Sequence, residues 1–397
     1  MKTGRKIKML TLALMVSICG WAENDNMTTI FNENTNFAIH QYSLMLDQTG
    51  RSGKVLNPNS IDKMSRMLWM PKDDWRSGFM PGCLWYLYRL TNDRAWERQA
   101  RRFTEDLDTI QYLTWHHDVG FMIGCSYLNG YRIHPSKAYK KVIIQTAKSL
   151  CTRFRPKAGV IQSWNVDRGW QAERGWKCPV IIDNMMNLEI LFEATKLSGD
   201  STYWKIAVDH ANTTLANHFR NDGSCYHVID YDPQTGAVLH KQTAQGYADN
   251  SIWTRGQAWA IYGFIMSYRY THEQKYLDQA VKTINMLFNH RNMPTDLVPY
   301  WDLDAPNIPN EPRDASAAAC IASALYELDG YLPENGYRNL ADRIMISLSS
   351  PDYRAPLGKN GCFLLMHSTG SIPHNMSIDV PSIYADYYFL EALTRRK

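Results

Sequence analysis

The sequence has 397 residues, of which 45% are hydrophobic and 21% charged, and its formal net charge is +4. This composition is typical of a globular protein with a large core, and the length alone allows two or three domains. Four positively charged residues near the N-terminus account for the net charge of +4. The rest of the sequence is therefore neutral overall and contains no basic block, so nucleic acid is not an expected partner.

The first predicted element is a secretory signal peptide over residues 1–22. Basic residues precede a short apolar stretch at 9–19, and small residues then lead to a cleavage site after Ala22. The apolar stretch is too short to span a membrane. We therefore expect an exported, periplasmic protein without a membrane span. A lipoprotein anchored through Cys19 is a weaker alternative, because Ile18 stands where a small residue is needed.

One pattern recurs three times further along the chain and predicts helical hairpins. A hydroxyl residue is followed by an acid, then by an aromatic residue, and then by alanine four positions later. The hydroxyl and the acid provide turn and N-cap chemistry. The aromatic residue and the alanine fall on one face of the helix that follows. The three copies begin at Thr91, Ser198 and Thr271.

Each copy follows a stretch that is apolar nearly all round and rich in small residues, as the inner helices of a ring require. The last such stretch runs to the C-terminus, and its predicted partner is an N-terminal helix around residues 33–48. We therefore predict an all-α protein with six inner and six outer helices, an (α/α)6 barrel that forms one domain over residues 23–397. The inner stretches are 77–90, 118–131, 182–197, 254–270, 314–328 and 379–397.

Eight cysteines occur, and their spacings predict neither a disulfide framework nor a zinc site. Cys83, Cys125 and Cys320 lie within apolar helical stretches, where buried thiols are expected. We predict no metal site and no cofactor.

Four of the predicted inner helices open at an aspartate: Asp118, Asp183, Asp314 and Asp379. An N-cap explains any one of them taken alone. If the N-termini of these helices converge on one mouth, however, their dipoles attract an anion and their carboxylates share one cavity. Burial and a neighbouring acid then raise one pKa and produce a general acid. Asp183 is the main candidate, because it follows three apolar residues and precedes an apolar helix.

A second polar cluster lies in QGYADNSIWTRGQAW, residues 245–259. Arg255 and Trp259 stand at the start of another inner helix, and Gln245 lies in the loop before it. An arginine can grip a carboxylate through two parallel hydrogen bonds. A structural arginine that ties loops together is the alternative.

Three single residues are further candidates. His227 lies on a predicted strand or loop between two hairpins, while Trp75 and Trp164 lie in loops before inner helices. Flat aromatic rings suit the faces of sugars. For each of the three, a packing role is an equal alternative.

Four separated segments together resemble glycoside hydrolase family 88, the unsaturated glucuronyl hydrolases. They are HDVGFM at 117–122, IDNMMNLEILFEA at 182–194, ADNSIWTRGQAWAIYGF at 248–264 and DVPSIYADYYFLEAL at 379–393. The resemblance runs from about residue 30 to the C-terminus. It implies an (α/α)6 barrel, in agreement with the hairpin count.

The resemblance also assigns roles to the candidate residues. It implies that Asp183 is the general acid and base and that Asp118 is the second essential aspartate. The other matches line the sugar pocket in the family: His227, Gln245, Arg255, Trp259, Trp75 and Trp164.

The implied enzyme is a glycoside hydrolase that takes a lyase-generated oligosaccharide with a 4,5-unsaturated uronate at its non-reducing end. It releases unsaturated glucuronic acid from glycosaminoglycan fragments by acid and base catalysed hydration of the enol-ether double bond. Two alternatives are an unsaturated rhamnogalacturonyl hydrolase that acts on pectin fragments and an envelope glycan-binding protein without catalysis. The sequence leaves open the glycosaminoglycan, its sulfation and the oligomeric state, and it indicates no obligate protein partner.

Overall fold

The computed structural model describes the backbone of residues 5–50 and 54–396, and the side chains of residues 27–49 and 54–396. The predicted signal peptide, residues 1–22, therefore lies outside the residues whose side chains are described, and so does Cys19. Among the described helices, none is both long enough and apolar enough to cross a membrane.

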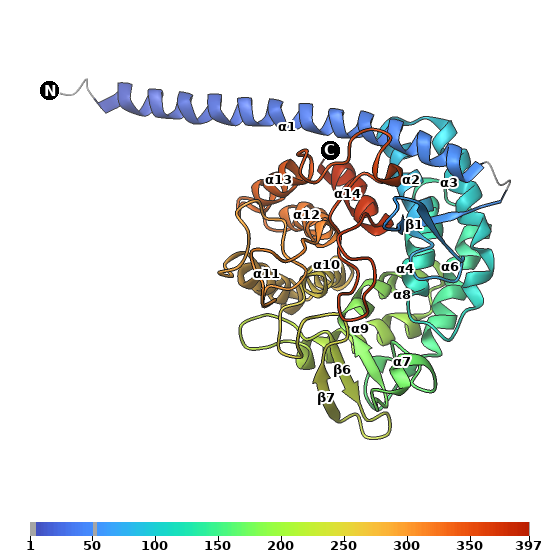
Figure 1. Ribbon diagram of the computed structural model, residues 1–397. Coiled ribbons are helices and arrows are strands. Elements are labelled where there is room, and N and C mark those ends of the chain that lie inside the picture. The colour runs from blue at the N-terminus through green and yellow to red at the C-terminus, as the bar shows by residue number, and fades with distance from the viewer. Residues whose placement is uncertain (1–4, 51–53, 397) are drawn as a thin grey trace.

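Six inner helices pack side by side in a closed ring (Figure 1). Each contacts the next, and the last contacts the first, which confirms the predicted all-α (α/α)6 barrel. In chain order the ring consists of α2 (Phe79–Thr91), α4 (Val119–Ile123) continued by the π-helix η2 (Gly124–Leu128) and α5 (Asn129–Ile133), the 3-10 helix η3 (Ile182–Asn187) continued by α8 (Glu189–Ser198), α10 (Thr254–Thr271), α12 (Ala315–Asp329) and α14 (Ile383–Arg396).

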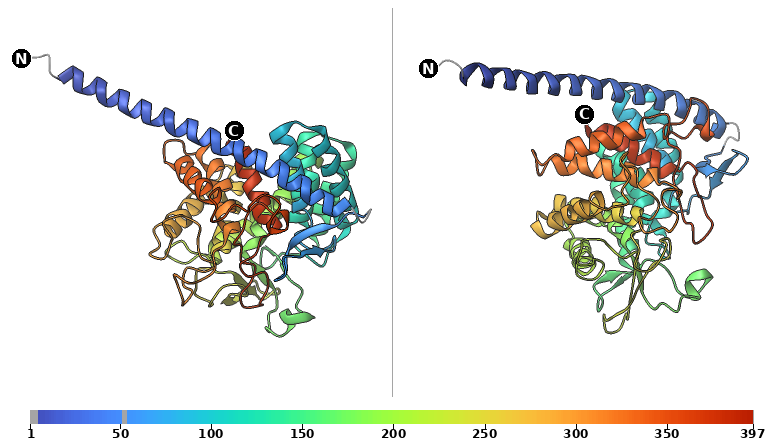
Figure 2. Two further views of the ribbon diagram at one scale, coloured as in Figure 1. Left: turned by 45° about the horizontal axis from the view of Figure 1, so that its top comes forward. Right: turned by 60° about the vertical axis from the view of Figure 1, so that its left-hand side comes forward.

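The outer helices are α1 (Arg5–Gly50), α3 (Arg94–Asp106), α6 (Lys137–Cys151), α9 (Ser201–Asn217), α11 (Gln274–Phe288) and α13 (Tyr337–Leu348). Helix α1 contains the predicted partner helix at 33–48, and its C-terminal part lies against the barrel (Figure 2). Tyr42 on α1 donates a hydrogen bond of 3.1 Å to Asp386 on α14, and Asn34 donates one of 2.7 Å to Ser349. The first helix thus packs against the last one, as predicted.

The recurring sequence pattern forms the same turn in each of three hairpins. The hydroxyl accepts a hydrogen bond from the backbone N–H two residues later, at 3.1 to 3.2 Å in all three copies. The acid then caps the next helix in two of them, Asp93 at α3 and Asp200 at α9. Glu273 makes no such bond at α11. The hydroxyl residue therefore accepts its turn hydrogen bond in all three copies, whereas the acid accepts a capping hydrogen bond in only two.

Two of the inner helices depart from regular α geometry, and the sequence pattern did not indicate this. The helix after Asp118 contains a π-helical segment, and the helix with Asp183 in its first turn begins as a 3-10 helix. Such departures from α geometry are frequent at functional sites. The expectation that Asp379 opens a helix was wrong: α14 begins at Ile383, and Asp379 has a positive φ of 54° in the preceding loop.

A small antiparallel sheet, β5 (Pro179–Ile181), β6 (Val228–Tyr231) and β7 (Val238–Gln242), lies at the mouth of the ring. Pairing of β5 with β6 places His227 beside the residue that follows β5, because Ile182 donates its backbone N–H to the His227 carbonyl at 3.0 Å. The register of this sheet therefore brings His227 next to Asp183. The other strands of the described residues form two short hairpins. Strand β1 (Asn57–Ile61) pairs with β2 (Met67–Met70), and β3 (Phe154–Arg155) pairs with β4 (Val160–Ile161).

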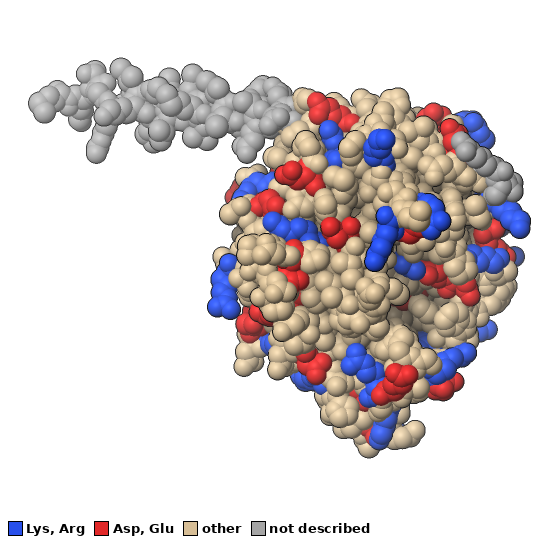
Figure 3. All heavy atoms as spheres, viewed as in Figure 1, with Lys and Arg blue, Asp and Glu red and all other residues tan. Residues whose placement is uncertain are grey.

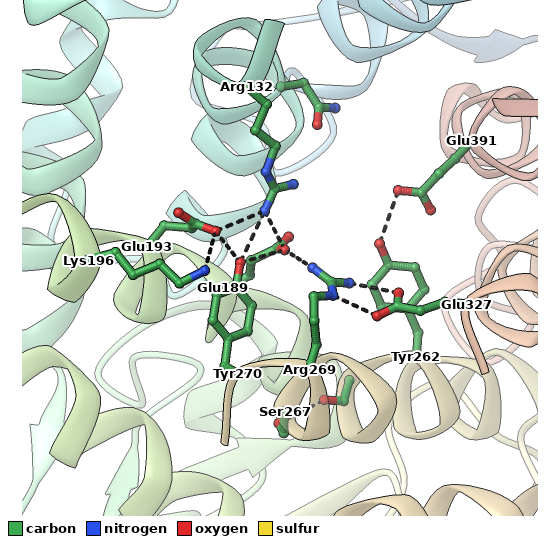
Figure 4. A network of polar contacts seen from close by, with 12 residues as sticks. Arg132, Glu189, Glu193, Lys196, Tyr262, Ser267, Arg269, Tyr270, Glu327 and Glu391 are labelled. Atoms are coloured by element: carbon green, nitrogen blue, oxygen red, sulfur yellow. Dashed lines mark hydrogen bonds and ion pairs between the residues drawn. The ribbon is translucent and has the colours of Figure 1, made fainter. Parts of the chain in front are cut away.

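The opposite end of the ring, where the inner helices finish, carries a network of paired charges (Figure 4). Arg132 donates to Glu189 at 2.6 Å. Arg269 donates to Glu327 through two parallel bonds of 2.6 and 2.7 Å, and it also pairs with Glu189. The cationic neighbours lower the pKa values of Glu189 and Glu327 despite their burial. Ion pairs therefore connect the ends of the inner helices here.

All seven cysteines in the described residues are free, and the predicted burial of Cys83, Cys125 and Cys320 is confirmed. In the same part of the chain, no group of three or more His, Cys, Asp or Glu side chains is placed to hold a metal ion.

Candidate active site

A cavity of about 330 Å3 opens at the mouth of the ring, where the inner helices begin. Positive and negative side chains are interspersed over the face of the molecule seen in Figure 3. Of the predicted site residues, Trp75, Gln245 and Arg255 line it. The other lining residues are Asn59, Arg76, Trp170, Gly370, Ser371, His374, Met376, Ser377, Ser382 and Tyr384.

Asp183 lies in the first turn of η3, directly after the buried strand β5, and its side chain is only 13% exposed. Its Oδ2 atom has no hydrogen-bond partner among the described residues. Burial raises the pKa of Asp183, the negative charge of Asp118 raises it further, and the positive charge of Arg255 opposes both, which leaves a pKa of about 7. A carboxyl group of this kind holds a proton near neutrality, as a general acid must.

Asp118 has the opposite charge state although it is also buried, at 7% exposure. Asn187 donates to its Oδ1 at 3.2 Å, His117 Nε2 lies 3.3 Å from the same oxygen, and His116 Nδ1 lies 3.3 Å from Oδ2. Burial alone would raise its pKa, but the two histidines and the Asn187 donor lower it to about 2. Asp118 is therefore an anion that acts electrostatically on Asp183.

Asn187 reaches Asp118 because η3 and α4 approach each other closely. Gly120 has no side chain, and a Cβ atom there would lie 2.5 Å from Asn187 Oδ1. The same Asn187 oxygen accepts the backbone N–H of Phe121 at 2.9 Å, which fixes the amide so that its nitrogen points at Asp118. One asparagine thus connects the two helices that carry the two aspartates.

His227 is 3% exposed and faces Asp183 with its Nε2 atom, 3.7 Å from Oδ2. Its Nδ1 accepts the backbone N–H groups of Ala244 and Gln245, at 3.0 and 3.2 Å. The ring proton therefore sits on Nε2. Burial and the nearby charge of Arg255 lower the pKa of His227 well below its ordinary value, so the ring is neutral and presents one N–H donor beside Asp183.

Capping does not explain the two aspartates. Neither Asp118 nor Asp183 makes a side-chain hydrogen bond to the start of its helix. Asp314 does, because its carboxylate accepts the Ser316 backbone N–H at 3.1 Å. Of the four aspartates expected at helix starts, Asp314 caps its helix. Asp118 and Asp183, whose charges act on each other, do not.

Arg255 lines the cavity, but both of its terminal nitrogens are engaged by the protein. Nη1 donates to Asp314 at 2.9 Å and to the Thr369 carbonyl, while Nη2 donates to the Gln245 side chain at 2.7 Å and to the Gly370 carbonyl at 2.6 Å. These bonds tie the start of α10 to α12 and to the loop before α14. Contact between Arg255 and a substrate stays a prediction, whereas its structural role is visible.

Trp75 and Trp164 pack against different aromatic neighbours. The Trp75 ring lines the cavity 5.4 Å from the Tyr384 ring. Trp164 stacks on Trp176 at 5.7 Å and meets the His227 ring edge-on at 5.9 Å. Of these two tryptophans, Trp75 lines the cavity, whereas Trp164 packs against His227 outside the lining.

Trp259 is 1% exposed and does not belong to the cavity lining. Its ring packs between Phe121 and Tyr388, each at a centroid distance of 5.5 Å. Its indole N–H has no hydrogen-bond partner among the described residues. The predicted contact of Trp259 with a sugar stays a prediction.

Several site residues were missed from the sequence. His116 and His117 directly precede Asp118, and Asn187 lies four residues after Asp183, so adjacency and helical spacing could have found them. Trp170 and His374 gave no such signal. Their rings meet at 4.8 Å only because two distant loops fold over the same mouth.

Known proteins share both the fold and the sequence. The model of Glycosyl Hydrolase Family 88 matches residues 54–389. An unsaturated glucuronyl hydrolase of Formosa agariphila is 48% identical over 329 residues, which cover 83% of this chain and 81% of that protein. An unsaturated chondroitin disaccharide hydrolase of Streptococcus pyogenes serotype M1 is 32% identical over 347 residues, 85% of each protein. The crystal structure of an unsaturated glucuronyl hydrolase specific for heparin matches with a TM-score of 0.88 at 42% identity, over 93% of this chain and 97% of that one.

The barrel and its pair of differently charged carboxyl groups define a glycoside hydrolase. The chain belongs to glycosyl hydrolase family 88. The resemblance seen in the four sequence segments is thereby confirmed.

Proposed function

We propose that this enzyme releases 4,5-unsaturated glucuronic acid from the non-reducing end of glycosaminoglycan oligosaccharides that a polysaccharide lyase has produced. The observation that carries the proposal is the largely buried Asp183, with a pKa of about 7 and an oxygen without a partner in the described structure, beside the ionised Asp118. The relatives support the substrate class, since two are named unsaturated glucuronyl hydrolases and one an unsaturated chondroitin disaccharide hydrolase.

The reaction starts with proton transfer to an electron-rich alkene. In the substrate the C4–C5 double bond is conjugated with the ring oxygen, so a proton from Asp183 adds at C4 and leaves positive charge shared by C5 and that oxygen. Asp183, now a carboxylate, takes a proton from a water molecule that adds at C5. The resulting hemiketal opens, and the hemiacetal then formed at C1 collapses and releases the next sugar. A single carboxyl group therefore acts first as acid and then as base.

Asp118 and His227 prepare Asp183 for this role. The Asp118 anion opposes ionisation of Asp183, so the proton is retained until the alkene accepts it. The neutral His227 presents its Nε2–H 3.7 Å from Asp183, where it can donate to a substrate oxygen placed between the two groups. As positive charge develops in the sugar ring, Asp118 also stabilises it.

The aromatic and amide groups of the mouth hold the sugar. Trp75 presents a ring to the cavity, and the Gln245 side chain lines it while its carbonyl oxygen accepts from Arg255. We assign Trp164 to the wall behind His227. Trp259 we assign to the aromatic base of the site beside Phe121.

We also propose that the protein is exported to the periplasm, because a basic segment followed by a short apolar one precedes residue 22. N-terminal sequencing of the protein recovered from cell fractions tests this. A mature N-terminus near residue 23 in the periplasmic fraction is expected, whereas an intact Met1 in the cytoplasmic fraction would overturn it. A lipid-modified Cys19 in a membrane fraction would instead favour the lipoprotein alternative.

Incubation with unsaturated disaccharides, followed by ultraviolet absorbance, tests the activity. The enol ether conjugated with the uronate carboxylate absorbs, and hydration removes this absorbance. We expect loss of absorbance with glycosaminoglycan-derived disaccharides. Loss only with pectin-derived disaccharides would indicate a rhamnogalacturonyl hydrolase, and binding without any loss would indicate a non-catalytic glycan-binding protein.

A further inference from the structure

Two arginines line the cavity, and each pairs with an aspartate, but they differ in the hydrogen-bond donors that remain. Arg255 uses both terminal nitrogens for four acceptors of the protein. Arg76 uses one edge only: Nε and Nη2 donate to the two oxygens of Asp74, at 2.8 and 2.7 Å. Nη1 of Arg76 has no partner among the described residues. A guanidinium held by one edge presents the other nitrogen to a ligand.

Arg76 is held firmly in the wall of the cavity. It lies between Trp75 and the start of the inner helix α2, and its side chain is only 16% exposed. Its Cζ atom lies 5.9 Å from the centre of the Trp75 ring. Asp74, which orients it, also acts electrostatically on His116, the neighbour of Asp118. The guanidinium of Arg76 is therefore oriented in advance, in the wall of the same cavity that Arg255 lines.

The surroundings of Arg76 favour an anion. None of the described residues that line the cavity is acidic, and the lining contains a second arginine and His374. The paired Asp74 leaves the guanidinium its remaining N–H donors, and a planar guanidinium matches the oxygens of a carboxylate or a sulfate. The substrate class proposed above carries such groups.

We propose that Arg76 binds an anionic substituent of the substrate sugar, either the carboxylate of the unsaturated uronate or a sulfate group. This inference rests on the proposed function. It deepens that function by naming a substrate-binding residue that neither the sequence analysis nor the family resemblance assigned. Arg255, by contrast, acts mainly to fix the loops around the site.

Two substitutions and a matched control test the proposal. Arg76→Gln removes both the positive charge and the planar pair of N–H donors. Arg76→Lys keeps the charge but lacks the planar guanidinium. The control is Arg66→Gln: Arg66 pairs with Asp62 at 2.7 Å in a similar local contact, but it is 70% exposed and does not line the cavity. Steady-state kinetics and calorimetric binding are measured with unsaturated disaccharides that are identical except for sulfation, and melting temperatures verify folding.

For Arg76→Gln we expect KM to rise roughly tenfold to a hundredfold with kcat changed only slightly, because a charge-assisted bond to the bound substrate is lost. Arg76→Lys should fall between the wild type and Arg76→Gln, and Arg66→Gln should match the wild type. An effect on both sulfated and unsulfated substrates identifies the carboxylate as the ligand. An effect on sulfated substrates alone identifies the sulfate.

Unchanged KM and affinity in a folded Arg76→Gln protein would overturn the inference. If this variant does not fold, the folded Arg76→Lys protein decides, and wild-type kinetics from it would overturn the inference equally. Absence of wild-type turnover on every disaccharide would overturn the proposed function instead. In that event the calorimetric comparison of wild type with the Arg76 variants still decides whether Arg76 binds the anion.

Discussion

The two ends of the barrel differ in how their functional and charged side chains are paired. At the mouth, Asp183 Oδ2, His227 Nε2 and the Trp259 indole nitrogen have no hydrogen-bond partner among the described residues. At the opposite end, Arg269 and Glu327 form two parallel bonds and are joined to further charges (Figure 4). A buried polar group without a partner costs stability, so these three groups at the mouth are candidates for contact with a ligand.

A single stretch of the inner ring contains both extremes. Asp183 has a pKa raised to about 7, because burial and the Asp118 anion favour its neutral form. Glu189, six residues later on the continuing helix, is also buried, but Arg132 and Arg269 lower its pKa. Burial alone therefore does not decide the charge of these carboxyl groups. The sign of the neighbouring charge decides it.

The largest expected effect is the loss of activity in Asp183→Asn. The amide cannot donate and then accept the proton that the reaction needs, so turnover should fall by roughly a thousandfold or more. Ultraviolet absorbance loss of an unsaturated disaccharide measures it. Circular dichroism should show an intact fold, and near-normal turnover would remove Asp183 from the mechanism.

The same substitution should stabilise the folded protein at alkaline pH. The folded pKa of Asp183 is raised, so the native state binds more protons than the unfolded state between about pH 4 and 7, and stability is lost as the pH rises through this range. Asp183→Asn removes this loss. Its melting temperature should exceed that of the wild type at pH 8 and approach it at pH 4. An equal difference at both values would contradict the raised pKa.

The opposite end of the barrel should respond to Arg269→Ala in stability rather than in catalysis. The substitution leaves Glu189 and Glu327 with fewer cationic partners, and we expect unfolding to become easier by about 3 kcal/mol. Arg101→Ala is the control, since Arg101 forms a partly exposed pair with Glu97 worth less than about 1 kcal/mol. Denaturant unfolding measures both variants. A large loss of kcat in the folded Arg269→Ala protein would show that the two ends are coupled.

Much of the fold could be predicted from the sequence, because local chemistry determines the hairpins. The hydroxyl and acid turns and the apolar inner helices follow from short segments, as at Thr91 and Asp93. The irregular segments of the helices near Asp118 and Asp183 were not predictable from local sequence, and these helices approach each other closely at Gly120 and Asn187. Tertiary contacts, not local propensity, select those geometries.

The site was predictable only in part for the same reason. The apolar context singled out Asp183, and its approach to His227 depends on sheet pairing that the sequence did not specify. The sequence also could not reveal that Arg255 is occupied by protein acceptors while Arg76 keeps a free edge. Such differences arise from loops that meet only in the folded chain.

A moderate effect is expected in the pH dependence of catalysis. A general acid works only while protonated, so kcat/KM of the wild type should fall as the pH rises above about 7, the pKa of Asp183. Asp118→Asn removes the anion that raises this pKa. The alkaline limb of the residual activity should then move to lower pH by on the order of one unit. An unshifted or higher limb would show that Asp118 does not act on Asp183 through its charge.

The smallest effect should follow the loss of a helix cap away from the mouth. Asp200 accepts the Thr202 backbone N–H at 2.8 Å at the start of α9. Asp200→Ala should lower the free energy of unfolding slightly and leave kcat/KM unchanged. Chemical denaturation and the absorbance assay check the two parts of this expectation. Altered kinetics would indicate that the outer helices influence the site.

The proton that Asp183 transfers to the substrate can be followed directly. When the wild-type enzyme acts on an unsaturated disaccharide in heavy water, Asp183 exchanges its proton with the solvent and should deliver deuterium to C4 of the released sugar. Nuclear magnetic resonance of the product should show one deuterium at C4, and reaction in labelled water should place the new oxygen at C5. A product without deuterium at C4, with the new oxygen at C1, would contradict hydration of the double bond and the role given to Asp183.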